Sequence, residues 1–370
     1  MKKTVLFLAN HDVTLYAFRR ELIERLLAEG HRVVISTPFG DYVQKLEAMG
    51  CECLKIEVDR HGMNPVTEFK LLLEYMKLLK QVKPDMVFTY TIKPNVYGGL
   101  VCGWMGIPCV ANITGLGTSV ENGGLKQKFV LLLYKMGIKH TQTVFFQNEY
   151  NRDFMMRHGV IGKNVGLLPG SGVNLEQHCL EPYPVDDGSG KLLFLIIGRI
   201  MRDKGTDEIL YAARKIKAEY PNAVFRFLGF NDGDYDEKIR AAVEEGVVEH
   251  LGQVPDVHAH IKQSHATIHA SYHEGMANVL LESAACGRPV IATDIPGCRE
   301  TFDEGISGIS CKSRDGESLT CAIRHFIQLP YEEKVRMGIA GREKMEREFD
   351  RRIVVERYIK ELSGAWSTNT

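Results

Sequence analysis

The chain has 370 residues, of which 44% are hydrophobic and 25% charged, and its formal net charge is −1. These proportions are typical of a globular protein and exclude a disordered or collagen-like chain. Because one hydrophobic core rarely serves so many residues, two domains are expected. No apolar run approaches the roughly 20 residues that span a membrane, and the short run after Met1 is typical of a first strand rather than a signal peptide.

Charge and cysteine content indicate which partners and which cellular compartment the protein is expected to have. The first 170 residues carry a net charge of +6 and the remainder −7. The basic half is therefore expected to meet an anionic partner such as a cytoplasmic membrane leaflet or a lipid diphosphate, unless the imbalance only reflects solvated faces. No basic motif is interleaved with aromatic residues, which argues against nucleic acid. The nine cysteines include no C-x-x-C pair and no ligand-like spacing with histidine. The sequence thus predicts a cytoplasmic protein with neither a disulfide framework nor a zinc site.

Short apolar runs and turn residues predict strands and helices that alternate along the first half of the chain. Strands are expected at 4–9, 32–36, 52–56, 85–89, 108–112, 143–147 and 165–168, and helices at 15–29, 40–49, 66–82, 95–104, 125–138 and 149–157. Such alternation implies a parallel sheet with helices on both faces. The first strand leads into LANHDVTLYAF, which contains no glycine, and this counts against a dinucleotide-dependent oxidoreductase.

A linker and a second alternating series follow. Residues 179–191 contain two prolines, two glycines and three acids, with little periodicity, as is typical of a linker. The second series runs from 192 to about 328, and two further helices are expected at 331–347 and 349–362. The chain is therefore predicted to be an α/β protein with two parallel-sheet domains.

The segment HEGMANVLLESAACGRPVIAT contains two glutamates eight positions apart, Glu274 and Glu282. Strands are expected on either side, at Ala266–Ser271 and Pro289–Thr293. Glu282 then lies in a helix and Glu274 in the loop ahead of it, at the carboxyl ends of the strands, where open α/β sheets bind ligands. The helix start would offer amides to a phosphate, although such a spacing alone is more often a helix with solvated acids. The amides expected to be unpaired belong to Gly275, Met276 and Ala277.

A second motif, GRIMRDKG, lies about 70 residues earlier. It follows the buried strand expected at Leu192–Ile197 and places Arg199 and Lys204 on the first βα loop of the second domain. Two cations there are well placed to hold a diphosphate, since arginine offers a planar fork and lysine a point charge. Alone, this pattern is more often a solvated loop. Together with the acid-helix-acid unit it is specific.

The two motifs together resemble the donor-site signature of the retaining glycosyltransferases of GT-B fold that carry an E-x7-E motif, glycosyltransferase family 4. The resemblance covers essentially the whole chain and is strongest over residues 166–310. PGSGVN at 169–174 resembles the family's interdomain segment, although Asn174 stands where aspartate is common. The opening NHDVTLYAFRRELIERLLAEGHRVVIST and TGLG at 114–117 resemble the bacterial subgroup that extends polyprenyl-diphosphate-linked glycans.

The resemblance implies two Rossmann-like domains that face each other across a cleft. The acceptor-side domain would span 1–175, with a C-terminal helix at 349–370 that crosses back onto it. The nucleotide-sugar domain would span 176–348. Retention would follow from front-side attack by the acceptor, with the leaving phosphate taking the proton. No pair of catalytic carboxylates, no metal and no cofactor is then implied.

Roles follow for individual residues. Arg199 and Lys204 would stabilise negative charge on the departing diphosphate, and Glu274, the third expected catalytic residue, would hold the transferred sugar. Glu282 would accept hydrogen bonds from the ribose hydroxyls. The turn that begins at Leu251 would hold the nucleotide base of the donor. The expected donor contacts further include Gly198, Gly275, Met276, Ala277, Asn278, Leu251 and Val254.

Candidate acceptor-side residues follow three strands of the first domain. His11 would be an acceptor-site base or, the favoured alternative, a hydrogen-bonding loop residue. Lys93 is a candidate ligand for an acceptor phosphate. Thr114 departs from the many family members that carry a histidine near this position, thought to touch the donor sugar. Gly115 and Gly117 would allow close backbone approach to a sugar or serve a tight turn.

Two segments, 68–83 and 125–140, combine leucine-rich runs with flanking lysines. Basic amphipathic helices can lie in a membrane interface, with lysine stems reaching the lipid phosphates. The alternative is that both apolar faces pack on the sheet. We expect peripheral association with the inner face of the plasma membrane.

The sequence thus predicts an enzyme that moves a hexose or N-acetylhexosamine from a nucleotide sugar, UDP-linked, to an undecaprenyl-diphosphate-linked saccharide. Such a reaction belongs to capsule, O-antigen or glycoprotein glycan assembly. Two alternatives remain: a nucleotide-sugar 2-epimerase of the same architecture, and a non-catalytic glycan-assembly scaffold. The intact Arg199, Lys204, Glu274 and Glu282 argue against the scaffold.

Overall fold

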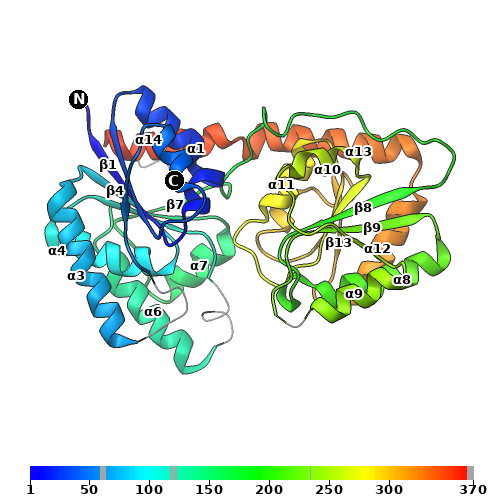
Figure 1. Ribbon diagram of the computed structural model, residues 1–370, viewed down its shortest axis with the longest axis horizontal. Coiled ribbons are helices and arrows are strands. Elements are labelled where there is room, and N and C mark those ends of the chain that lie inside the picture. Colours follow the sequence, from blue (N-terminus) through cyan, green and yellow to red (C-terminus); the bar gives the residue numbers. More distant parts are fainter. Residues whose placement is uncertain (59–63, 117–119, 121–122, 234, 365–370) are drawn as a thin grey trace. The chain divides into compact units, whose positions relative to one another are not determined.

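The computed structural model describes residues 1–58, 64–116, 120, 123–233 and 235–364, which form two compact units (Figure 1). The first unit contains Met1–Ser171 and the described residues from Arg352 onward, and the second contains Gly172–Arg351. The sequence places these two boundaries at 175 and 348 instead. No helix in the described part of the chain is long and apolar enough to cross a membrane.

The first unit is built on a seven-stranded parallel sheet with the order β3-β2-β1-β4-β5-β6-β7. Its strands are β1 (Thr4–Leu8), β2 (Arg32–Thr37), β3 (Glu52–Lys55), β4 (Met86–Tyr90), β5 (Cys109–Ile113), β6 (Thr143–Phe146) and β7 (Asn164–Leu167). Its helices are α1 (Asp12–Ala28), α2 (Val43–Ala48), α3 (Pro65–Val82), the π-helix η1 (Pro94–Gly98), α4 (Gly99–Met105), α6 (Gly124–Ile138), α7 (Glu149–Arg157) and α14 (Arg351–Ser363).

Both faces of this sheet are covered because its strands are apolar on both sides. Val5 and Phe7 of β1 pack in one cluster with residues of α1 and α14, whereas Leu6 and Leu8 pack in another with residues of α3. This period of two is the normal alternation of side chains along a strand. Figure 1 shows α1 and α14 on one side of the sheet and α3, α4 and α6 on the other. The last helix is tied down further by Tyr358, whose hydroxyl accepts a hydrogen bond of 2.8 Å from the Asn112 side chain.

The second unit has a six-stranded parallel sheet with the order β10-β9-β8-β11-β12-β13. Its strands are β8 (Leu192–Ile197), β9 (Ala223–Leu228), β10 (Glu249–His250), β11 (Ala266–His269), β12 (Val290–Thr293) and β13 (Gly308–Cys311). Its helices are η2 (Arg202–Lys204), α8 (Thr206–Glu219), α9 (Asp236–Glu244), α10 (Val257–Gln263), α11 (Asn278–Ala285), η3 (Arg299–Thr301), α12 (Gly316–Gln328), α13 (Tyr331–Lys344) and η4 (Met345–Phe349).

Most predicted elements are present with shifted ends, and two helices differ in kind. The helix predicted at 95–104 opens as the π-helix η1, at a place where α6 approaches so closely that a Cβ on Gly137 would lie 2.3 Å from the carbonyl oxygen of Val96. The helix predicted at 331–347 ends as α13 at Lys344 and continues as the π-helix η4. Neither irregularity follows from hydrophobic periodicity, which does not separate π-turns from α-turns.

Candidate functional site

Lys204, His269 and Glu274 meet at the carboxyl edge of the second unit's sheet. Because β8 and β11 are neighbours, the loops that follow them lie side by side. Lys204, in the loop after β8, forms an ion pair with Glu274 in the loop after β11. His269, the last residue of β11, places Nε2 2.8 Å from the same carboxylate oxygen. One carboxylate therefore holds the two loops together.

The surroundings of Glu274 keep it ionised. Although burial would raise its pKa, the hydrogen bond from His269 and the positive charge of Lys204 lower the pKa of Glu274 to about 2. The carboxylate is therefore negative throughout the physiological pH range. Only 13% of the Glu274 side chain and 26% of Lys204 are exposed, so salt screens this pair less than it would a surface pair.

Two glycines allow the loops around this ion pair to approach each other. Gly205 has a φ of +69°, and a Cβ there would lie 2.1 Å from the carbonyl oxygen of Ala270. Gly297 has a φ of +87°, and a Cβ there would lie 2.8 Å from the carbonyl oxygens of Glu274 and Gly275. Any side chain at either glycine would force the loops apart in addition to straining its own backbone.

Backbone hydrogen bonds fix the loop after β11 on the loop after β8. The amide of Tyr272 donates to the carbonyl oxygen of Asp203 at 2.8 Å, and the Ser271 hydroxyl donates to the same oxygen at 3.2 Å. Thr293 on β12 donates its hydroxyl to the carbonyl oxygen of Ser271 at 2.6 Å. The loop that carries Glu274 is therefore held from both sides.

Gly198 and Arg199 lie in the same loop as Lys204, and all three line a small pocket together with His269. Arg199 places Nη1 2.9 Å from the Asp232 carboxylate, and about half of each side chain is exposed. An exposed pair of this kind contributes little to stability. The Arg199 guanidinium is therefore accessible from solvent and could leave Asp232 at small cost.

The segment before α11 corrects one expectation. The sequence predicts unpaired amides at Gly275, Met276 and Ala277, but that of Ala277 donates to the carbonyl oxygen of Gly297 at 2.8 Å, and Gly275 is not without a partner either. The turn after β12 folds over the loop and takes this donor. Asn278, the first residue of α11, carries a buried side-chain oxygen with no hydrogen bond among the described residues. It is an acceptor available to a donor group on a ligand.

Glu282 lies within α11 and differs from Glu274 in its electrostatics. Burial raises the pKa of Glu282 to about 7, although the positive charge of Arg351 opposes this shift. The carboxyl is therefore about half ionised at neutral pH. The next residue, Ser283, hydrogen-bonds at 2.8 Å to the hydroxyl of Thr267 on β11, which seats the helix on the sheet.

Leu251 and Val254 belong to the turn between β10 and α10. The amide of Leu251 donates to the carbonyl oxygen of Phe227 on β9. Leu251 itself is 46% exposed. The carbonyl oxygen of Gly252 accepts a hydrogen bond of 2.8 Å from the amide of Gly229. Val254 packs against a small apolar cluster beneath the turn. The turn is thus anchored on β9, and it presents an apolar side chain to solvent.

The acceptor-side candidates lie in the first unit, after the neighbouring strands β1, β4 and β5. His11 caps α1, with Nδ1 3.3 Å from the amide of Val13. Lys93 forms an ion pair with Glu68 on α3, and both side chains are mostly buried. Thr114 and Gly115, directly after β5, are half-buried, and the Gly117 prediction lies outside the described residues. Strand order places the three loops along one sheet edge.

Two helices of the first unit expose apolar side chains that share one helix face. On α6, Leu125, Phe129, Leu132 and Met136 are exposed at spacings of three and four residues, while Val130, Leu131, Tyr134 and Ile138 are buried. On α3, the exposed apolar residues are Val66, Phe69 and Leu73. Helix α4 packs against both. Each helix therefore packs on the unit and also exposes an apolar stripe, so packing on the sheet does not use up its apolar surface.

Sequence reasoning missed His269, Gly297 and Arg351. A histidine inside the otherwise apolar strand ATIHA is a signal, because a buried polar side chain requires a partner. Gly297 follows β12 and carries no local pattern beyond a proline-glycine turn. Arg351, at the start of α14, affects the pKa of Glu282 from a position 69 residues away, which no spacing rule reveals.

Comparison with known proteins covers both units. Residues 4–148 match the family model described as "Glycosyl transferase 4-like", and residues 185–344 match the model described as "Glycosyl transferases group 1". An N,N'-diacetylbacillosaminyl-diphospho-undecaprenol alpha-1,3-N-acetylgalactosaminyltransferase from Campylobacter jejuni is 26% identical, with 96% of both chains covered. An Escherichia coli UDP-Gal:alpha-D-GlcNAc-diphosphoundecaprenol alpha-1,3-galactosyltransferase is 25% identical, with 70% of both chains covered.

Solved structures share the fold at lower sequence identity. The Anabaena protein HepE, in complex with UDP and glucose, aligns with a TM-score of 0.80 and 14% identity over 98% of this chain and 100% of its own. A glycosyltransferase from Rickettsia africae aligns with a TM-score of 0.77 and 17% identity over 100% of both chains. The two family models together span most of the sequence, one in each unit. The chain therefore belongs to the glycosyltransferases that join a 4-like N-terminal domain to a group 1 C-terminal domain.

Proposed function

We propose that this glycosyltransferase moves a hexose or N-acetylhexosamine from a UDP-sugar to an undecaprenyl-diphosphate-linked saccharide, with retention of configuration. The observation that carries the proposal is the contact of Lys204 and His269 with Glu274. Glu274 lies just before α11, the helix that contains Glu282. This set offers a cation for a diphosphate, a fixed carboxylate for a sugar and a second carboxyl for a ribose. The relatives from Campylobacter and Escherichia, whose names specify diphospho-undecaprenol acceptors, support the acceptor class.

The donor would lie with its diphosphate beside Lys204 and Arg199. Both cations follow β8. Lys204 would keep its contact with Glu274 and donate a further hydrogen bond to a phosphate oxygen, because an ammonium group has three donors, and Arg199 holds only an exposed aspartate. Charge that develops on the leaving diphosphate is then stabilised by groups already in place. Gly198 has a φ of +142° and no atom near its missing side chain, so the backbone there leaves room for a phosphate.

Glu274 and Glu282 would take different parts of the donor. The ionised Glu274, fixed by His269, would accept hydrogen bonds from hydroxyls of the transferred sugar. Glu282 lies deeper along α11 and would accept from the ribose hydroxyls. The amide of Met276 and the side chain of Asn278 would complete the contacts at the helix start, and the turn from Leu251 to Val254 would hold the nucleotide base.

Retention is supported by the linkage named in the relatives. Both are α-1,3-transferases by name, and transfer from an α-linked nucleotide sugar to an α-linked product retains the anomeric configuration. A retaining reaction with front-side attack needs the leaving phosphate as base, which the cations beside it would orient. His11, Lys93, Thr114 and Gly115 would border the acceptor from the first unit, where Lys93 would exchange Glu68 for an acceptor phosphate.

The purified chain should transfer sugar from one UDP-sugar to a polyprenyl-diphosphate-linked N-acetylhexosamine. Mass spectrometry of the lipid product identifies the sugar, and the anomeric proton coupling in its NMR spectrum should show the donor's α configuration. A β-linked product would contradict retention. Interconversion of the UDP-sugar without acceptor would indicate the epimerase instead. If a panel of UDP- and GDP-sugars gives no turnover and no thermal stabilisation, the non-catalytic scaffold is the correct alternative.

Affinity for UDP should depend on pH through Glu282. A ribose hydroxyl donates to the ionised carboxylate, so binding lowers a pKa of about 7 and releases a proton. Between about pH 6 and pH 8, ionisation of Glu282 alone should raise UDP affinity up to roughly tenfold. Calorimetric titration of the wild type and Glu282→Gln isolates this contribution, because the UDP phosphate titrates in both. The variant should bind UDP more weakly and lose the extra pH slope.

Glu274→Gln is the matched control for this measurement. It replaces the other glutamate of the same motif, and UDP lacks the sugar that Glu274 would hold. Its pH slope should stay like that of the wild type, because Glu282 is unchanged, while turnover with the UDP-sugar falls. Loss of the pH slope in both variants would show that the two glutamates do not divide the donor in this way.

The exposed stripe on α6 supports peripheral membrane contact. Leu125, Phe129 and Leu132 are flanked by four exposed lysines, and such a face can insert shallowly while the ammonium groups meet lipid phosphates. The flanking residues are Lys126, Lys128, Lys135 and Lys139. A polyprenyl-linked acceptor is itself held in the membrane, so a surface of this kind on the acceptor-side unit would place the enzyme beside its substrate.

Reversal of Lys126, Lys128 and Lys135 to glutamate should abolish sedimentation with anionic liposomes. Each lysine near such a surface contributes about 1 kcal/mol, and the attraction is screened by salt. Transfer to a long polyprenyl acceptor should slow, while transfer to a short, water-soluble acceptor should be spared. The control reverses three exposed lysines elsewhere on the same unit, Lys2, Lys55 and Lys163, and should still sediment. If the α6 variant still sediments fully with the liposomes, the α6 stripe is not the membrane-binding surface.

A further inference from the structure

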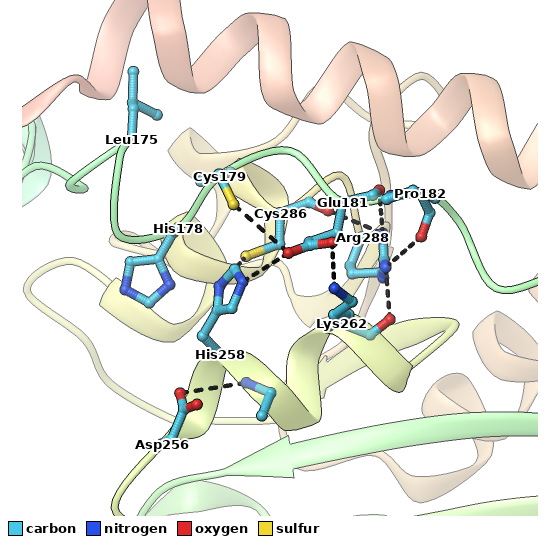
Figure 2. A network of polar contacts seen from close by, with 12 residues as sticks. Leu175, His178, Cys179, Glu181, Pro182, Asp256, His258, Lys262, Cys286 and Arg288 are labelled. Atoms are coloured by element: carbon cyan, nitrogen blue, oxygen red, sulfur yellow. Dashed lines mark hydrogen bonds and ion pairs between the residues drawn. The ribbon is translucent and has the colours of Figure 1, made fainter.

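Two histidines and a cysteine from three separate segments meet on the second unit, at the end of α11 that lies beyond Glu282. His178 lies in the segment before the linker, His258 on α10, and Cys286 at the C-terminal cap of α11. Each offers one ligand atom, and these atoms all lie within 4.8 Å of one another. Figure 2 shows the His258 ring beside the Cys286 sulfur, with His178 next to it. His178 and Cys286 are buried, and His258 is half-buried.

The distances in this cluster are close to those between the ligands of a bound zinc ion. His258 Nδ1 lies 3.3 Å from Cys286 Sγ, and the two imidazole rings have their centroids 5.8 Å apart. Zinc binds nitrogen at about 2.0 Å and sulfur at about 2.3 Å in tetrahedral geometry, which places such ligand atoms roughly 3.5 Å from each other. The described side chains therefore need only small movements to enclose an ion.

A carboxylate behind His258 orients the ring for this role. His258 Nε2 lies 3.1 Å from Glu181 Oε1, and Lys262 holds the other carboxylate oxygen at 2.9 Å. The hydrogen on Nε2 then points to Glu181 and leaves the Nδ1 lone pair toward Cys286. Metal-binding histidines commonly donate their second nitrogen to a carboxylate in this way. Arg288 donates to the Glu181 carbonyl oxygen at 3.0 Å and fixes the backbone of the same residue.

We propose that His178, His258 and Cys286 bind a zinc ion, with water in the fourth position. Imidazole nitrogen and thiolate sulfur favour zinc over magnesium or calcium, which take oxygen ligands. The Cys286 sulfur–zinc bond forms as the thiol proton leaves to solvent, with no change of oxidation state. This replaces the expectation of no zinc site, which followed from ligand spacing along the sequence and not from their positions in the fold.

The ion would join the segment before the linker to the helix that carries Glu282. Cys286 ends α11, and His258 lies on α10, so zinc would cross-link two helices and the incoming chain within one unit. Such a link stabilises the folded state by its binding free energy, because the unfolded chain holds the ligands far apart. The ion would act as a cross-link within the second unit, and this proposal does not depend on the proposed donor and acceptor.

The test measures zinc retention by the full chain. Protein stripped with a chelator, incubated with zinc chloride and desalted should retain one equivalent by mass spectrometry of the metal, and its unfolding temperature should rise. Cobalt in place of zinc should give a thiolate-to-cobalt charge-transfer band. Cys286→Ser and His258→Gln should lose the band and the retained zinc. The matched controls, Cys321→Ser and His325→Gln on exposed positions of α12, should keep both.

The measurement on the wild-type chain tests the zinc proposal even if a variant at a buried position does not fold. Absence of retained zinc and of a thiolate–cobalt band on the wild-type chain overturns the proposal and leaves the cluster as a hydrogen-bonded network. Retention that is unchanged in folded Cys286→Ser or His258→Gln also overturns it, since the ion would then lie elsewhere. Circular dichroism of each variant establishes which of them are folded.

Discussion

The ion pair between Lys204 and Glu274 is the contact on which the candidate donor site depends. It joins residues 70 positions apart, and it does so only because β8 and β11 are neighbours in the sheet. Gly205 and Gly297 permit the approach, and His269 adds a second hydrogen-bonding group to the same carboxylate. Loss of Glu274 leaves the Lys204 charge uncompensated in a largely buried place, and loss of Lys204 leaves Glu274 with His269 alone, so the pair sets the shape of both loops.

The two glutamates of the E-x7-E motif differ because their surroundings differ. Glu274 is held ionised by a lysine and a histidine, whereas burial raises the pKa of Glu282 to about 7. Glu274 thus stays negatively charged, whereas the ionisation of Glu282 depends on what binds beside it. A single helix, with its preceding loop, supplies both because Glu274 lies beside Lys204 and His269, whereas Glu282 lies within the helix, where the charge near it is that of Arg351.

The fold and much of the site were predictable from the sequence because they depend on local pattern. Buried apolar runs, glycines and the acid-helix-acid unit indicated the two parallel sheets and the position of Glu274 and Glu282 around α11. Pairing choices were not predictable: the contact of Lys204 with Glu274 and of Lys93 with Glu68 depends on side-chain directions that spacing does not encode. The amide of Ala277 is paired for the same reason, since Gly297 arrives from another strand.

The central claim is that Lys204 and Glu274 act as one unit on the donor, and a double-mutant cycle tests it most directly. kcat/KM is measured for Lys204→Met, Glu274→Gln and the double variant with the UDP-sugar that supports turnover. Each single variant should lose roughly two to four orders of magnitude, and the double variant should lose little more than the worse single one. Additive losses would contradict a shared role. A loss of less than about threefold in folded Lys204→Met would show that this loop does not hold the diphosphate.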